Sequence, residues 1–236
     1  MKTINIKRTV KNIGMIDTET IGSIYKADAS LPFDISITWC DSKGNPLFKR
    51  CYLVRKFINN KYIMHGSFSA GKYDYYLDKI NNDKNYFVGS VRDIAKDITR
   101  LNKKYNVKVL TAYNERFDRN KIEQLFNEFN IENPIKNMQW FDLMELGKEI
   151  STTKDYQNFC EENKHILKHG EESKFLTPNG AYRKTAESIY CYMINDPHFT
   201  ENHTGLEDLK IENAIFHYAK KHCTNVKLDL NQLHVA

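Results

Sequence analysis

The stretch Ile13-Gly14-Met15-Ile16-Asp17-Thr18-Glu19 is an apolar run that ends in two carboxylates separated by one residue. Its length and composition are those of a short buried strand. Alternate side chains of a strand share a face, so we predict that Asp17 and Glu19 point the same way. Like charges held this close repel each other unless a cation lies between them. The stretch therefore predicts a site for a hard divalent cation such as Mg2+ or Mn2+.

Composition places this strand in an ordinary globular protein of 236 residues, with 41% hydrophobic and 28% charged side chains. That length predicts one domain over residues 1–236. No apolar stretch approaches the roughly 20 residues of a membrane span, and we expect a soluble, intracellular, cytoplasmic protein without a membrane partner. The five cysteines are scattered and never paired as CxxC, so we expect reduced thiols. The net charge of +5 is compatible with a polyanionic partner but does not identify one.

The segments around the first strand predict an α/β fold. Residues 13–18, 35–39 and 47–54 have the patterns of three strands, joined as an antiparallel meander. Two further strands are predicted at 107–113 and 139–141, with a helix between them, and this order indicates a parallel part of the sheet. The expectation is a mixed five-stranded sheet flanked by helices.

Helices are predicted from their caps and from apolar spacing. Ser90 is the predicted N-cap of one helix, Asn114 of the next, and Asp142 of a third. The segment of about 152–202 is predicted to be mainly helical, and a last helix runs from about 205 to 222.

Two more carboxylates lie on apolar faces of these helices. Asp118 precedes Ile122 and Leu125 at helical spacing, and Asp208 precedes Ile211 in the same way. An exposed aspartate at a helix start is the plain alternative for Asp118, because the helix dipole tolerates negative charge there. A charge on a core-facing stripe is otherwise costly unless it is paired or bound to a metal.

A histidine precedes the last helix. The sequence Thr204-Gly205-Leu206-Glu207 fits a capping box, in which the residue before the cap packs against the fourth helical residue. These residues are His203 and Asp208, so the local pattern predicts an imidazole beside a carboxylate. A lone histidine at such a place is usually a surface residue, and its carboxylate neighbour favours a chemical role instead.

Three motifs in this order resemble the DnaQ-like exonucleases of the DEDDh type. They are Asp17-Thr18-Glu19-Thr20-Ile21-Gly22, Tyr113-Asn114-Glu115-Arg116-Phe117-Asp118 and His203-Thr204-Gly205-Leu206-Glu207-Asp208. The helical segment before the third motif resembles small phage-type members. Many relatives have histidine at Tyr113, and alanine at Gly205 and Leu209. The resemblance implies a ribonuclease H-like fold.

The resemblance also implies a reaction and its residues. It implies a 3′-to-5′ exonuclease that releases 5′-mononucleotides by two-metal-ion hydrolysis, in a bacterial or phage-infected cell. Two Mg2+ or Mn2+ ions would be held by Asp17, Glu19, Asp118 and Asp208, with His203 as the general base. Thr18, Thr20 and Asn114 lie near these residues in the motifs and are candidate substrate contacts. The expected partner is the 3′ end of a nucleic acid, single-stranded DNA in preference to RNA, with a polymerase or a replication or repair complex as a further candidate.

Other functions stay open on the sequence. The same chemistry would serve an exonuclease for RNA or short oligonucleotides, and the same fold would serve a non-catalytic module that binds nucleic acid or a polymerase. A different metalloenzyme could use His165 and His169, which stand four residues apart on a predicted helix, with Glu161 and Glu162 before them. Such a spacing alone usually marks a solvated face.

Overall fold

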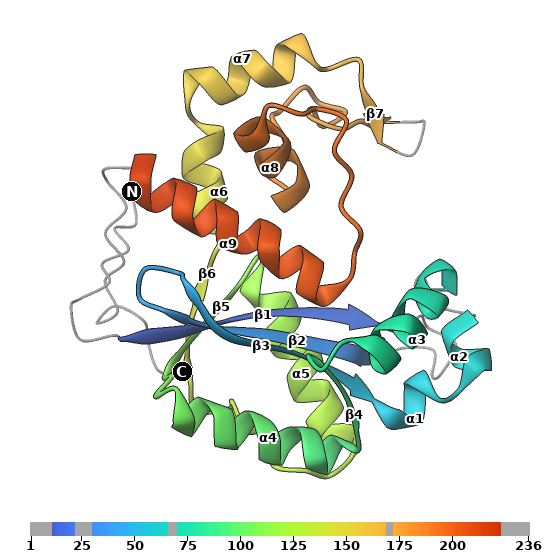
Figure 1. The fold of residues 1–236 in the computed structure, drawn as a ribbon. Helices are drawn as coiled ribbons and strands as arrows, with labels where there is room; N and C mark the ends of the chain where they lie inside the picture. The colour runs from blue at the N-terminus through green and yellow to red at the C-terminus, as the bar shows by residue number, and fades with distance from the viewer. Residues whose placement is uncertain (1–10, 22–29, 66–69, 169–171, 223–236) are drawn as a thin grey trace.

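The computed structural model describes residues 11–21, 30–65, 70–168 and 172–222. A mixed sheet with the strand order β4-β3-β2-β1-β5-β6 forms its centre (Figure 1). The strands are β1 (Asn12–Thr20), β2 (Pro32–Asp41), β3 (Pro46–Val54), β4 (Tyr86–Gly89), β5 (Val109–Ala112) and β6 (Gln139–Asp142). The predicted meander is confirmed, because β1 pairs with β2 and β2 with β3 in antiparallel register. The pairs β1–β5, β5–β6 and β3–β4 are parallel.

The sheet has six strands where the sequence predicted five, and the additional strand is β4. It contains only four residues, and its two outer residues are more buried than its two inner ones. That pattern lacks the period of two by which strands are found in a sequence. The strand forms because it pairs with β3, which lies far from it in the sequence.

Helices cover both faces of the sheet. They are α1 (Arg55–Ile58), α2 (Lys61–His65), α3 (Tyr73–Asn82), α4 (Val91–Lys104), α5 (Glu115–Glu128), α6 (Met144–Ser151), α7 (Lys154–Glu162), α8 (Ala186–Ile194) and α9 (Gly205–His222), with a short 3-10 turn η1 (Ala70–Lys72). In Figure 1, α4 and α5 lie on one face and α9 crosses the other, with α6 and α8 packed against α9. No helix in the described part of the chain is long and apolar enough to cross a membrane.

The segment 152–202 contains less helix than we expected. Its helices are α7 and α8, and the chain between them forms turns and a small hairpin of β7 (Leu167–Lys168) and β8 (Glu172–Ser173). An isolated bridge between Leu176 and Tyr182 follows. Phe175, within this irregular stretch, is fully buried.

The predicted caps have mixed outcomes. Ser90 is the N-cap of α4, as predicted, and it forms a full capping box with Asp93. The prediction for Asp142 is wrong by one residue, because the N-cap of α6 is Leu143, although Asp142 Oδ1 accepts the backbone N–H of Met144 at 2.9 Å. Asn114 occupies the cap position of α5, but its side chain makes no cap hydrogen bond and its φ is +67°. Asp142 Oδ1 serves α5 in its place by accepting the N–H of Asn114 at 2.9 Å.

Candidate active site

Asp17 and Glu19 lie near the carboxyl end of β1, where both side chains are half-buried, and Thr18 between them is buried. Carboxylate oxygens of Asp17, Glu19 and Asp208 lie within 4.8 Å of one another. Asp208 is 4% exposed in the first turn of α9, which crosses this face of the sheet (Figure 1). The fold therefore brings together three of the four predicted carboxylates from two distant segments.

The start of α9 is held against the sheet by Asp34 of β2. This buried carboxylate accepts hydrogen bonds from Ser36 Oγ (2.8 Å), Tyr76 Oη (2.8 Å) and the Gly205 N–H (3.3 Å). A Cβ at Gly205 would lie 2.5 Å from Ser36 Oγ, so no side chain fits there. Glycine in place of the alanine usual in the resembling family is thus explained by the close approach of α9 to β2.

His203 belongs to a second group of side chains that shares Asp208. Ligand atoms of Glu201, His203 and Asp208 lie within 4.8 Å of one another. His203 Nδ1 is 3.8 Å from Glu201 Oε2, and the backbone of His203 is left-handed, with a φ of +50°. The expected pairing of the His203 imidazole with the Asp208 carboxylate is present. The capping box from which it was predicted is absent, because the buried Thr204 Oγ1 has no hydrogen-bond partner.

Asp118 on α5 is buried, with 3% exposure, so the alternative of an exposed aspartate at the helix start is wrong. Its Oδ1 accepts a hydrogen bond from Thr18 Oγ1 at 2.8 Å. Asp118 is in neither group of close ligand atoms found among the described residues, although its charge acts on Asp17. The Thr18 hydroxyl thus helps to hold this carboxylate in place, and Thr18 also lines the cavity described below.

A fifth carboxylate, Glu212, was missed by the sequence analysis. It stands one helical turn after Asp208 on α9 and is 3% exposed. Its Oε1 accepts the Tyr113 backbone N–H at 3.3 Å, while Oε2 is buried without a partner. The spacing of four residues from Asp208 on a buried helix face was the signal that could have found it.

Burial and mutual repulsion raise the pKa values of these carboxyl groups. Burial followed by the charges of Asp118 and Glu212 puts the pKa of Asp17 well above its ordinary value. Burial raises the pKa of Glu19 to about 9, against the opposing effect of Lys72. Burial and the charge of Glu201 raise the pKa of Asp208 to about 8. The charge of Asp208 also contributes to the raised pKa of Glu19.

Two other groups modify this acidic cluster. Burial raises the pKa of Asp118 to about 7, although hydrogen bonds from Thr18 favour its ionised form. Lys72, at the end of η1, donates from Nζ to the His203 carbonyl oxygen at 2.5 Å. Its positive charge acts on both Glu19 and Asp208. The lysine therefore offsets part of the negative charge of the site.

The donor atoms fit a divalent cation. Asp17 Oδ2 and Asp208 Oδ1 are both buried without a hydrogen-bond partner. Leaving such oxygens unpaired is costly, and carboxylate oxygens are the ligands that Mg2+ and Mn2+ prefer. A cation between these groups would satisfy the orphaned oxygens and remove the repulsion that raises their pKa values.

A cavity of about 330 Å³ opens onto the acidic cluster. Its lining residues are Asp17, Thr18, Glu19, Thr20, Tyr113, Phe117, Met144, Thr185, Ala186, Glu201, His203, Asp208 and Glu212. Thr20 is among them, as expected of a substrate contact, whereas Asn114 is not among the described residues that line the cavity. Phe117 is 43% exposed at this cavity although it precedes the buried Asp118, so it is not a core residue.

Glu187 of α8 anchors the loop that carries His203. It is 3% exposed, pairs with Lys168 Nζ (3.0 Å) and Lys174 Nζ (3.4 Å), and accepts the Glu201 N–H at 3.2 Å. Burial alone would raise the pKa of Glu187, but hydrogen bonds from Lys168 and Glu201 hold it below its usual value. Lys174 also donates to the Phe199 carbonyl oxygen, so one buried ion cluster fixes both ends of the segment 199–201.

Replacing Glu187 with glutamine should lower the free energy of unfolding by about 3 kcal/mol, because it leaves the buried Lys174 without its counter-charge. Urea denaturation measures this loss, and amide hydrogen exchange at Glu201 should speed up. The matched control is Glu207→Gln, which breaks the exposed pair of Glu207 and Lys210 (2.5 Å) on α9. That change should cost less than about 1 kcal/mol. Equal effects of the two variants would contradict the anchoring role.

The alternative metal site at His165 and His169 gains no support from the described residues. His165 lies in a turn after α7 ends at Glu162, so the predicted helical spacing is wrong for it. His169 lies outside the described residues, as does Gly22 of the first motif. His165 is in neither group of close ligand atoms among the residues that the structure describes.

Comparison with known proteins finds similar structures but no similar sequence. No protein-family model matches the sequence. No curated protein matches it either. The nuclease domain of 3′hExo, a DEDDh family member bound to rAMP, superposes with a TM-score of 0.56 at 12% identity, over 97% of this chain and 100% of that one. A 3′-exonuclease that recognises the histone mRNA stem-loop gives 0.55 at 12% identity, over 100% of this chain and 73% of that one.

Exonuclease I of E. coli, solved with a dA16 oligonucleotide, gives a TM-score of 0.53 at 13% identity. The match covers 89% of this chain and 41% of that protein, so the chain spans about two fifths of the length of exonuclease I. The predicted ribonuclease H-like fold, a mixed sheet flanked by helices, is thereby confirmed, with six strands in the main sheet.

Proposed function

We propose that this protein is a metal-dependent 3′-to-5′ exonuclease of the DEDDh type. The observation that carries the proposal is the convergence of Asp17, Glu19, Asp208 and His203 on one acidic cavity. A fold shared with 3′hExo and exonuclease I supports it, since both are nucleases by their descriptions. The whole described chain serves as one catalytic domain in this proposal.

Asp17, Glu19 and Asp208 would hold two divalent ions, Mg2+ or Mn2+, with Asp118 completing the set. Such ions, when bound, lower the pKa of a water molecule and stabilise a leaving oxygen. The chain itself supplies the charges and their spacing. Asp118 keeps its position through the Thr18 hydroxyl, and Glu212 adds further negative charge behind Asp17.

His203 is the proposed general base. Glu201 faces Nδ1 of the imidazole at 3.8 Å, which leaves Nε2 as the nitrogen that can take a proton from an attacking water. A neighbouring carboxylate favours the imidazolium that forms in this step. The left-handed backbone at His203 and the anchoring of Glu201 by Glu187 together set where the imidazole stands.

The proposed substrate is a single-stranded 3′ end, DNA in preference to RNA. Exonuclease I with dA16 supports DNA, while 3′hExo and the histone mRNA stem-loop support the RNA alternative. Phe117 is the exposed aromatic residue on which a base would stack, with Lys121 Nζ 5.7 Å from its ring. Thr20 is retained as a contact to the terminal nucleotide. A polymerase or repair partner and a cytoplasmic location remain predictions.

Digestion of matched 5′-labelled DNA and RNA oligonucleotides, with Mg2+, Mn2+ or EDTA, tests the proposal. The expected result is a ladder that shortens from the 3′ end, with 5′-mononucleotides as products and no cleavage in EDTA. The ratio of the two rates decides the sugar preference. Metal-independent binding of both oligonucleotides without any product would favour the binding module instead.

A further inference from the structure

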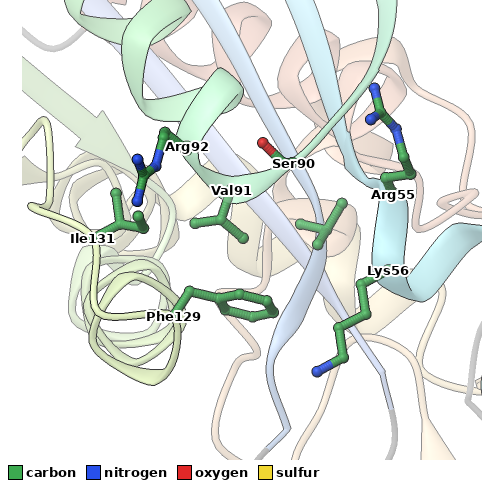
Figure 2. Close-up of a pocket in the computed structure, with 8 residues that line it drawn as sticks. Arg55, Lys56, Ser90, Val91, Arg92, Phe129 and Ile131 are labelled. Atoms are coloured by element: carbon green, nitrogen blue, oxygen red, sulfur yellow. The ribbon is translucent and has the colours of Figure 1, made fainter.

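A second cavity of about 440 Å³ lies away from the acidic cluster, where the ends of three elements meet. It is lined by Val54, Arg55, Lys56, Ser90, Val91, Arg92, Phe129 and Ile131. These residues lie at the junction of β3 and α1, at the start of α4, and in the chain after α5 (Figure 2). None of them belongs to the proposed catalytic set.

The cavity has an apolar floor and a positively charged rim. Its floor is apolar: Val54 and Val91 are buried, and Phe129 and Ile131 are half-buried. Its rim carries three exposed cationic side chains, Arg55, Lys56 and Arg92, and no carboxylate is among its described lining residues. Lys56 Nζ stands 5.1 Å from the centre of the Phe129 ring, which shows how closely charge and apolar surface adjoin.

We propose that this cavity binds an acidic protein segment, with one large apolar side chain of the partner in the cavity and flanking carboxylates on the rim. A volume of about 440 Å³ is within the range of pockets that enclose a ligand group. Apolar surface favours an aromatic or aliphatic anchor, and the exposed Arg55 and Arg92 on the rim favour a negatively charged neighbour. The two preferences select a peptide that carries both features side by side.

The floor argues against a nucleobase as the occupant. A buried base needs hydrogen-bond partners for its polar edges. The uncharged polar side chain at the cavity is Ser90, and its hydroxyl donates to Asp93 Oδ2 at 2.6 Å and accepts the Asp93 N–H in the capping box of α4. A hydrocarbon side chain makes no such demand, so the observations favour a protein segment over a strand of nucleic acid.

Fluorescence anisotropy with two short labelled peptides tests this. One contains aspartates and glutamates around a single phenylalanine, and the other has alanine in place of the phenylalanine. At low salt the first should bind the full-length protein, and the second should bind about tenfold more weakly or not at all. Arg92→Glu and Ile131→Asp should each weaken the first peptide by about tenfold. Glutamate near the start of a helix is compatible with the helix dipole, so Arg92→Glu should fold normally.

Lys103→Glu is the matched control, since it reverses another exposed charge near the far end of the same helix, and it should leave binding unchanged. The catalytic variant Asp17→Asn should bind the peptide normally, so failure of the exonuclease proposal would leave this test intact. Absence of peptide binding would overturn the inference. So would an oligonucleotide whose binding is lost in Arg92→Glu while the peptide does not bind, a result that would assign the cavity to nucleic acid.

Discussion

Asp17→Asn is expected to abolish nuclease activity, with a fall in kcat of at least about a thousandfold. Metal-bound groups contribute several kcal/mol of transition-state stabilisation, and about 4 kcal/mol corresponds to a thousandfold in rate. Asparagine keeps the shape of the side chain but removes one of the charges that would hold a cation beside Glu19 and Asp208. Single-turnover digestion of a labelled oligonucleotide measures the loss. Full activity with unchanged metal dependence would contradict the assignment of Asp17.

The same substitution should stabilise the metal-free protein. Asp17 is surrounded by Asp118, Glu212, Glu19 and Asp208, and burial with these charges raises its pKa well above the ordinary value. Asparagine bears no charge, so folding of the variant does not require a buried carboxylate to be protonated or to stay ionised among like charges. A gain of about 1 kcal/mol would raise the Tm in EDTA at pH 8 by roughly 2–4 °C.

Asp17→Asn is thus expected to lose activity and to gain stability. The control is Glu123→Gln, on the exposed side of α5. It removes a carboxylate of equal charge away from the cluster and should leave both the rate and the Tm unchanged. A decrease in Tm for Asp17→Asn in EDTA would mean that Asp17 stabilises the fold, and would contradict the picture of a repulsive site.

Without metal, the protein should lose stability as the pH rises. Asp and Glu titrate near pH 4 in an unfolded chain. In the folded protein the pKa values of Asp118, Asp208 and Glu19 are raised to about 7, 8 and 9, with burial as the first cause in each case. Between pH 4 and these values the folded state binds more protons than the unfolded state, so the free energy of unfolding falls with rising pH. A loss of about 3 kcal/mol between pH 5 and pH 9 would lower the Tm in EDTA by roughly 6–12 °C.

Addition of Mn2+ at pH 8 should reverse this loss, because a cation favours the ionised carboxylates. At a metal concentration of about 100 times the Kd, the gain would be about 2.7 kcal/mol. Differential scanning calorimetry in EDTA and in Mn2+ measures both effects. The double variant Glu19→Gln/Asp208→Asn is the control, and it should show a shallower pH dependence and little response to Mn2+. A Tm in EDTA that is constant or rises between pH 5 and pH 8 would contradict the prediction.

At two positions where this sequence differs from the DEDDh motifs that it resembles, Tyr113 and Gly205, the residue is explained by contacts with residues distant in the sequence. Tyr113 stands where many relatives have histidine, and its hydroxyl donates to the Lys184 carbonyl oxygen. The Tyr113 hydroxyl also fills the space that a Cβ at Gly147 would need. Gly205 likewise adjoins Ser36 of β2. These are long-range packing contacts, and no local pattern reports them.

Local patterns in the sequence were sufficient for the three acidic motifs, for most of the strands and for the helices α4, α5 and α9. Strand alternation and helical spacing act between near neighbours. The placement of Asp17 and Glu19 on one face and of Asp118 on an apolar stripe therefore followed from the order of residues, whereas the burial of Asp118 did not. Short-range periodicity carries this information because it reflects which side of an element meets the core.

Only the tertiary structure decided the rest of the site. Glu212 and Lys72 join the cluster through contacts between segments far apart in the chain, and Glu187 fixes the loop that bears Glu201 and His203. Strand β4 exists through its pairing with β3. The pKa values of the carboxyl groups depend on burial and on charges brought near by folding, so these properties belong to the folded chain and not to any stretch of its sequence.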